Sequence, residues 1–156
     1  MKMTKDLVLA LLKGTQEFLS GEEMSRRLKI SRAAVHTAVT LLRGEGYEVQ
    51  STTNRGYRLA GSPDRLSLGE ILPWLPEGRA ERVVFLDEVD STNTYLKKAT
   101  GAPGGMVAIA NEQSGGRGRL GRNFYSPKDV GVYLSMLVRP EVSHADIGGI
   151  SACAAI

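Results

Sequence analysis

The chain has one cysteine, Cys153, among its 156 residues. A single cysteine excludes an internal disulfide framework and a zinc site built from several cysteines. Long hydrophobic runs are also missing, since the longest early run, Leu7 to Leu12, falls well short of a membrane span. Internal repeats and low-complexity tracts are absent as well. We therefore expect a cytoplasmic globular protein with no membrane partner.

The basic residues are concentrated at the amino terminus. Residues 1–60 hold 10 Lys and Arg against 6 Asp and Glu, a net charge of +4, whereas residues 61–156 hold 10 against 11, a net charge of −1. A basic segment joined to a nearly neutral remainder favours a nucleic-acid-binding module attached to something else.

The first sixty residues predict a winged helix-turn-helix. Apolar residues at helical spacing predict a helix over Thr4–Lys13. Ser20, followed three residues later by Glu23, is a capping box that begins a second helix, and Ser31 begins a third that ends near Arg43. Two short helices separated by a tight turn are typical of the helix-turn-helix. Alternating residues from 47 to 59, around a turn at 53–56, predict the hairpin of the wing.

The third helix is expected to present short polar or basic side chains to a DNA major groove, with Val35, Ala38, Val39 and Leu42 on its buried side. The first-turn amides could also bind a phosphate. The residues expected to contact operator DNA are Ser31, Arg32, Ala33, His36, Thr37 and Thr40, with Arg55 at the wing tip. The alternative is a winged module that contacts proteins, because such folds serve several functions.

Residues 61–65 combine turn residues and a proline and predict a linker between a domain at 1–60 and another at 66–156. Strands are expected at 82–89, 106–111 and 131–138, and helices at 66–75, 91–99 and from Ser143 onward. The expected fold class is α+β with a mixed sheet.

Residues 115–122 hold four glycines, three arginines and no acid. Glycine allows the backbone to approach a ligand closely, and arginine offers donors suited to carboxylate or phosphate. These residues favour a mobile loop that closes over an anion, against the alternative of a plain basic surface loop. The spacing of Gly116, Gly118 and Gly121 also fits a dinucleotide-binding fingerprint, but Pro127 stands where that fingerprint needs a helix.

Four motifs together resemble the catalytic domain of biotin–protein ligases. They are Asp90-Ser91-Thr92-Asn93, Glu112-Gln113-Ser114 leading into the loop at 115–122, Ser126-Pro127, and Tyr133-Leu134-Ser135-Met136. With the winged helix in front, residues 1–156 resemble in order the bacterial bifunctional ligases that also repress biotin synthesis genes.

The resemblance implies a two-step reaction. Biotin and ATP, the latter with Mg²⁺, give biotinyl-5′-adenylate, and biotin then passes to a lysine of a biotin carboxyl carrier protein. Adenylate binding would promote a homodimer on operator DNA. The implied contacts with biotin or the adenylate are Ser91, Thr92, Asn93, Gln113, Gly116, Arg117, Gly118, Arg119 and Arg122, with Arg119 as the catalytic residue and no metal ligand. Taken alone, Ser91 and its neighbours also fit a simple helix cap.

The family's Lys-Trp-Pro-Asn-Asp segment and carboxyl-terminal β-barrel do not occur in these residues. We expect a fragment that ends within a helix, with an incomplete catalytic domain and no ligation of its own. Two alternatives stay open: a regulator that senses biotin without ligase activity, and lipoate or octanoate transfer, which the loop and the winged helix disfavour.

Overall fold

The computed structural model describes residues 4–118, 120 and 122–139. Three helices open the chain: α1 (Thr4–Lys13), α2 (Gly21–Leu28) and α3 (Arg32–Gly44). The Ser20 hydroxyl accepts a hydrogen bond from the Glu23 amide at 3.0 Å, and the Ser31 hydroxyl accepts one from the Ala34 amide at 3.1 Å. Each bond satisfies an amide that has no partner within its helix. The capped starts expected at both serines are confirmed.

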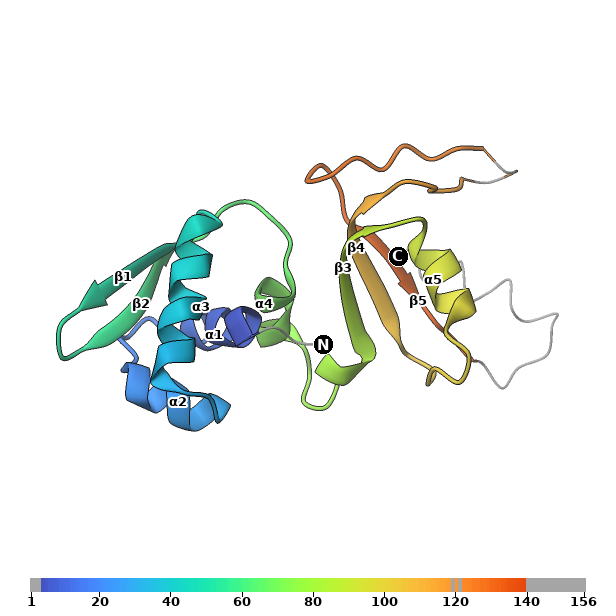
Figure 1. Cartoon of the computed structure of the whole chain (residues 1–156). Coiled ribbons are helices and arrows are strands. Elements are labelled where there is room, and N and C mark those ends of the chain that lie inside the picture. Colours follow the sequence, from blue (N-terminus) through green and yellow to red (C-terminus); the bar gives the residue numbers. More distant parts are fainter. Residues whose placement is uncertain (1–3, 119, 121, 140–156) are drawn as a thin grey trace.

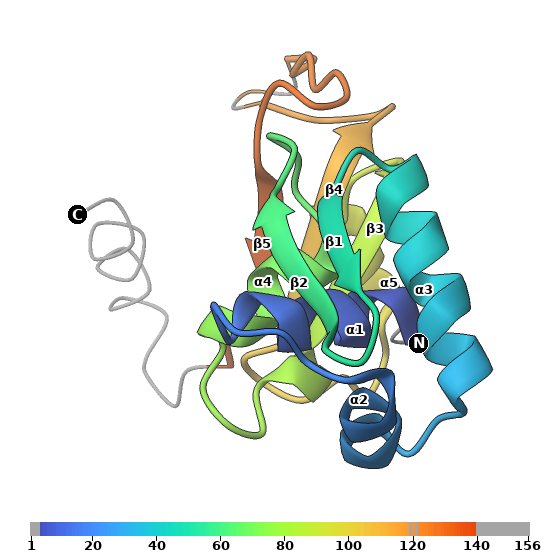
Figure 2. The same ribbon diagram turned by 90° about the vertical axis from the view of Figure 1, so that its left-hand side faces the viewer.

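The wing is an antiparallel pair, β1 (Glu48–Thr52) and β2 (Gly56–Gly61), that lies beside α3 (Figure 2). Leu19 pairs with Tyr57 through two backbone hydrogen bonds of 2.8 and 2.9 Å and so adds a third, one-residue strand. Gly56 has φ +101°, and a Cβ on it would lie 2.0 Å from the Leu19 oxygen. Only glycine fits this position.

The main core lies within this module. The four side chains expected on the buried side of α3 are all at most 2% exposed. They pack against residues of α1, of α2 and of the wing. The cluster consists of Val8, Leu9, Leu12, Leu19, Met24, Val35, Ala38, Val39, Leu42, Tyr47 and Val49.

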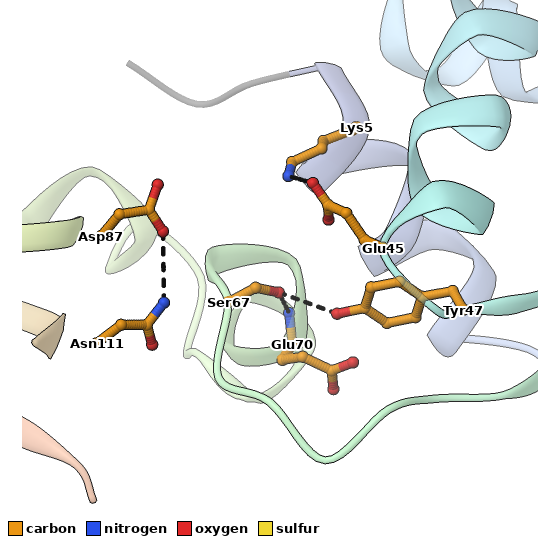
Figure 3. Close-up of polar contacts among 7 residues, drawn as sticks. All are labelled: Lys5, Glu45, Tyr47, Ser67, Glu70, Asp87 and Asn111. Carbon is orange, nitrogen blue, oxygen red and sulfur yellow. Dashed lines mark hydrogen bonds and ion pairs between the residues drawn. The ribbon is translucent and has the colours of Figure 1, made fainter. Parts of the chain in front are cut away.

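A short helix after the wing, α4 (Leu68–Ile71), continues as a 3₁₀ turn over Leu72–Trp74 and packs on α1 (Figure 1). A Cβ on Gly69 would lie 2.8 Å from Leu9 Cδ2, so the two helices meet closely at this glycine. Glu70 pairs with Lys13 of α1. Ser67, which caps α4, lies 3.3 Å from the Tyr47 hydroxyl (Figure 3).

The packing of α4 on α1 affects where the boundary between the two domains lies. β2 runs through Gly61, the first residue of the expected linker, and α4 contacts the amino-terminal module. The division at 61–65 therefore stays a prediction, and the packing of α4 on α1 favours a later boundary.

The second half is built on a three-stranded sheet in the order β3 (Val83–Val89), β4 (Val107–Gln113), β5 (Tyr133–Met136). β3 and β4 are parallel, and β5 is antiparallel to β4. A 3₁₀ turn (Ala80–Arg82) precedes β3, and α5 (Thr92–Lys98) joins β3 to β4. The expected mixed sheet is confirmed, although the last strand is shorter than the 131–138 expected.

α5 contacts β4 and β5 and covers one face of the sheet. Ser135 faces α5, so the alternation of side chains along a strand places Leu134 and Met136 on the opposite face, where each is 58% exposed. Asn111, on the central strand β4, is buried on that face and donates to Asp87 at 3.4 Å (Figure 3).

Among the described residues, no helix is long and apolar enough to cross a membrane. The expected helix from Ser143 and the position of Cys153 lie outside the described residues.

Candidate functional site

A cavity of about 260 Å³ opens at the amino-terminal end of α5. It is bounded by the start of α5, the end of β4, β5 and the loop at residues 115–122, called the glycine–arginine loop below. Its lining residues are Ser91, Thr92, Asn93, Gln113, Arg117, Phe124, Val132, Tyr133, Leu134 and Ser135. Five residues that the sequence assigned to ligand binding therefore share one cavity, although they are spread over 27 positions of the chain.

A hydrogen-bonded chain of side chains fixes the polar groups of this cavity. The Gln113 Oε1 atom accepts from the Thr92 amide at 2.9 Å and from the Thr92 hydroxyl at 3.1 Å. Thr92 Oγ1 lies 2.8 Å from Ser135 Oγ. Because the single Thr92 hydroxyl proton goes to Gln113, Ser135 must donate in the last contact. The remaining lone pairs of Ser135 can then accept from a ligand.

The other end of Gln113 is anchored as well. Its Nε2 atom donates to the buried Ser126 hydroxyl at 3.2 Å, and Ser126 in turn donates to the Phe124 oxygen at 3.2 Å. One of the two N–H bonds of the Gln113 amide is left for a ligand. The cavity thus offers an amide donor and a hydroxyl acceptor in fixed positions.

Ser91 caps α5 and also lines the cavity, so its contact with a ligand stays a prediction that this position allows. Its hydroxyl accepts from the Thr94 amide at 3.5 Å. The preceding carboxylate of Asp90 accepts from the Ser91 amide at 2.7 Å, and this hydrogen bond, aided by Lys98 at 3.4 Å, lowers the pKa of Asp90. Asp90 therefore stays ionised and holds the first turn of α5 in place.

The described residues at the two ends of the glycine–arginine loop pair as a narrow hairpin. The Phe124 amide donates to the Gly116 oxygen at 2.9 Å, and the Gly118 amide donates to the Arg122 oxygen at 2.7 Å. A Cβ on Gly116 would lie 2.7 Å from both the Phe124 oxygen and the Ser126 hydroxyl, so the base of the hairpin requires glycine. Arg117 leaves this base and lines the cavity.

Gly116, Gly118 and Arg122, which were predicted to contact the ligand, are not among the residues that line the cavity. Gly118 and Arg122 close the hairpin through their backbones. Arg119 lies outside the described residues, so its catalytic role stays a prediction.

Ser126 and Ser135 belong to two of the motifs in the sequence, but neither was predicted to contact the ligand. A signal existed for Ser135, because it is the only hydroxyl-bearing residue besides Tyr133 in an otherwise apolar stretch from 131 to 138. For Ser126 no local pattern exists, since its partner Gln113 is thirteen residues away.

The residues expected at DNA are exposed along α3 and the wing. Arg32, Ala33 and His36 line a hollow of about 780 Å³ between α3, the start of α2 and the wing turn, and Glu22 also lines it. His36 Nδ1 lies 3.3 Å from the Tyr57 hydroxyl, which connects α3 to the wing.

Two residues that were expected to contact DNA already donate their hydroxyl protons within α3. The hydroxyls of Thr37 and Thr40 donate to the Ala33 and His36 oxygens one turn earlier. These hydroxyls can therefore only accept hydrogen bonds from a base edge.

Comparison with known proteins matches two parts of the chain to families. Residues 4–58 match the HTH domain, and residues 85–155 match the biotin/lipoate A/B protein ligase family. The bifunctional ligase/repressor BirA of Escherichia coli is 38% identical over 149 residues, which are 95% of this chain and 46% of that protein. The protein of the same description from Bacillus subtilis is 35% identical over 143 residues, which are 90% of this chain and 44% of the relative.

This chain is a homologue of the bifunctional ligase/repressors. It carries the HTH domain followed by a segment of the ligase family, and it spans a little under half the length of the curated relatives that it matches. The cavity at α5 lies within the ligase-family match, and the exposed face of α3 lies within the HTH match. α4 falls between the two matches.

Proposed function

We propose that this homologue comes from a biotin–protein ligase that also represses biotin synthesis genes. The observation that best supports the ligase half is the fixed Thr92–Gln113–Ser135 network beside Arg117. The HTH match and the basic amino-terminal module support the repressor half.

The groups in the cavity fit the ureido ring of biotin. That ring presents two N–H groups and one carbonyl oxygen, which need acceptors and a donor. The lone pairs of Ser135 and Ser91 supply acceptors, and the free N–H of Gln113 supplies a donor. Asn93 lines the same cavity and can do either.

The proposed chemistry brings two anions together. A carboxylate oxygen of biotin attacks the α-phosphorus of ATP, the bond from that phosphorus to the bridging oxygen breaks, and pyrophosphate leaves. A lysine amine of the biotin carboxyl carrier protein then attacks the acyl carbon, loses a proton, and AMP leaves. Arg117, Arg119 and Arg122 are proposed to hold the carboxylate and phosphate, because charge stabilisation and positioning dominate such steps.

Mg²⁺ is proposed to arrive with the ATP phosphates. In the described part of the chain, no group of three or more His, Cys, Asp or Glu side chains could hold a metal ion. For the repressor role, bound adenylate would order residues 115–122 and promote a homodimer that places two winged helices on operator DNA.

Calorimetry of this chain with biotin, before and after Thr92→Val, tests the ligand site. Thr92→Val removes one hydrogen-bond partner from Gln113 and one from Ser135, the residues proposed to contact biotin. The free energy of biotin binding should weaken by about 1–3 kcal/mol, which corresponds to a five-fold or larger loss of affinity. Thr94→Val, the same change two residues along α5, is the control and should leave affinity unaltered. Equal affinities for all three proteins would place biotin elsewhere.

Biotin-dependent release of pyrophosphate from ATP, measured on the longer protein from which this chain is proposed to come, tests the ligase activity. Biotin binding without pyrophosphate release would indicate a regulator that senses biotin. For the loop, Arg119→Gly is expected to raise the dissociation rate of biotinyl-5′-adenylate, and an unchanged rate would refute the role of Arg119.

A further inference from the structure

Two arginines of the wing share one aromatic ring. The guanidinium carbon of Arg55 lies 4.7 Å from the centroid of the Phe18 ring, and that of Arg58 lies 4.8 Å from the same centroid. Both distances are within the range of cation–π attraction. Arg55 belongs to the wing turn, Arg58 to β2, and Phe18 to the segment before α2.

The strand pairing explains why the ring is there. Leu19 pairs with Tyr57 across the edge of β2, and both of these side chains contribute to the core side of the wing. Because side chains alternate along a strand, the neighbouring residues Phe18 and Arg58 point to the outer face together. There Arg58 also donates to the Gln50 side-chain oxygen at 2.7 Å.

Both guanidinium groups are held by neutral partners. The ion pairs among the described residues involve Glu45, Glu70, Glu23 and Asp90, and neither wing arginine takes part in them. A carboxylate partner would cancel the charge of an arginine toward outside anions. A ring face orders the guanidinium while leaving its charge and much of its in-plane N–H edge available. Ordering before binding also lowers the entropic cost of forming a contact.

We propose that Phe18, Arg55 and Arg58 form a phosphate clamp on the outer face of the wing. In this clamp both arginines contact backbone phosphates of duplex DNA, and Phe18 is a positioning residue. The proposal rests on the proposed DNA-binding function and deepens it, since the sequence had assigned the wing a single arginine. DNA is the fitting partner because a duplex presents phosphates at regular spacing on both sides of the groove that a wing tip approaches.

The test measures binding of the full chain to a fluorescein-labelled mixed-sequence duplex by anisotropy at several KCl concentrations. Each lost phosphate contact should reduce the slope of log K against log [KCl] by about 0.9. Arg58→Ala and Arg55→Ala should each show this reduction. The control is Lys97→Ala, which removes one positive charge from α5 in the other half of the molecule and should leave the slope unchanged.

Phe18 is tested with charge held constant. Phe18→Leu should weaken binding about five- to thirty-fold, the loss of two exposed cation–π contacts, and should reduce the slope although no charge is removed. Phe18→Tyr keeps the ring and should restore both affinity and slope. A role of Phe18 in folding alone would change the melting temperature without changing the slope, so circular dichroism accompanies each variant.

The outcomes separate this proposal from the one on which it rests. If the parent chain binds no duplex at low salt, the DNA-binding function fails, and the clamp fails with it. If the parent binds but Arg58→Ala keeps the parent slope, or Phe18→Leu binds as Phe18→Tyr does, DNA binding stands and the clamp is overturned.

Discussion

The two halves of the chain differ in where their apolar side chains lie. The main buried cluster is formed entirely by residues 8–49, and Leu9, Leu12, Met24 and Leu42 are at most 1% exposed. Among the described residues after Gly61, the buried apolar side chains are few and small, apart from Leu68, Leu96 and Ile109. Most exposed large apolar side chains also lie after Gly61: Trp74, Leu120, Phe124, Tyr125, Val130, Val132, Leu134, Met136 and Val138.

The two candidate sites, on α3 and at the cavity beside α5, are therefore held in place by different interactions. The helix α3, which is proposed to face DNA, is held from behind by a close-packed core, so its geometry depends on apolar volume. The cavity at α5 is held by hydrogen bonds among Thr92, Gln113, Ser126 and Ser135 and by a close backbone approach at Gly116. The geometry of α3 should therefore be sensitive to substitutions that remove apolar volume. The cavity at α5 should be sensitive to substitutions that remove polar atoms or add volume.

The largest effect is expected from the amino-terminal core. Leu12→Ala should lower the free energy of unfolding by about 2–5 kcal/mol, because it leaves a cavity in a fully buried cluster. Leu134→Ala, the same change at a side chain that is 58% exposed, should cost less than about 0.5 kcal/mol. Guanidinium denaturation followed by circular dichroism at the helical signal measures both. Similar losses would mean that the exposed face of β5 is covered in solution.

A smaller effect, confined to the ligand site, is expected at the loop. Gly116→Ala places a Cβ 2.7 Å from two oxygen atoms, and overpacking of this kind costs about 1–3 kcal/mol. Calorimetry should show biotin affinity reduced five-fold or more, with the unfolding of α1–α3 unaltered. Gly118→Ala is the matched control, since its nearest atom would be the Arg122 oxygen at 3.5 Å. If Gly118→Ala weakened biotin binding as much, close packing at Gly116 would not be the cause.

The contact between α4 and the amino-terminal module can be broken separately. Gly69→Ala places a Cβ 2.8 Å from Leu9 Cδ2 and 3.0 Å from the Asp6 oxygen, and should destabilise that module by about 1–3 kcal/mol. Gly44→Ala is the control, because nothing lies within 4 Å of a Cβ there. Thermal unfolding and the fluorescence of Trp74, just beyond α4, report the result. If Gly69→Ala left the stability of that module unchanged, α4 would belong with the second half, as predicted from the sequence.

The smallest effect concerns Tyr47, which links the wing to the cap of α4. Burial raises the pKa of Tyr47 from 10.0 to about 12. The folded protein thus keeps a proton that the unfolded chain loses near pH 10, so this stabilisation is complete below pH 10 and is lost as pH rises toward 12. At neutral pH, Tyr47→Phe should cost about 0.5–1.5 kcal/mol, the value of its hydrogen bond to Ser67.

The stability difference between parent and Tyr47→Phe isolates this titration, because lysines titrate alike in both proteins. The difference should shrink and then reverse between pH 10 and 12. A constant difference over that range would show that the hydroxyl is exposed to water in solution.

Local chemistry allowed much of the fold to be predicted. The capped starts at Ser20 and Ser31 and the apolar stripe of α3 depend on residues three or four positions apart, so they are visible in the sequence. The three strands and the mixed sheet followed from the spacing of apolar runs, whereas the order of the strands in the sheet was not predicted. The packing of α4 on α1 was not predicted, because Gly69 and Leu9 are sixty residues apart and small size alone does not identify a partner.

The candidate site divides in the same way. Its motif residues were predicted by resemblance, and five of them share the cavity. The orientation of Gln113 by Ser126 and of Thr92 by Ser135 could not be predicted, since each contact depends on how the loop and β5 return to α5.

The sequence by itself determined the helix starts, the wing and the α+β class, because these follow from short-range patterns. The candidate ligand contacts were predicted from the resemblance of its motifs to a known family. Tertiary structure alone decided which hydroxyl donates to which amide, why residue 116 must be glycine, and that Phe18 lies beneath two arginines. The reason is physical: hydrogen-bond direction and van der Waals contact act over a few ångströms, and only folding brings distant residues that close.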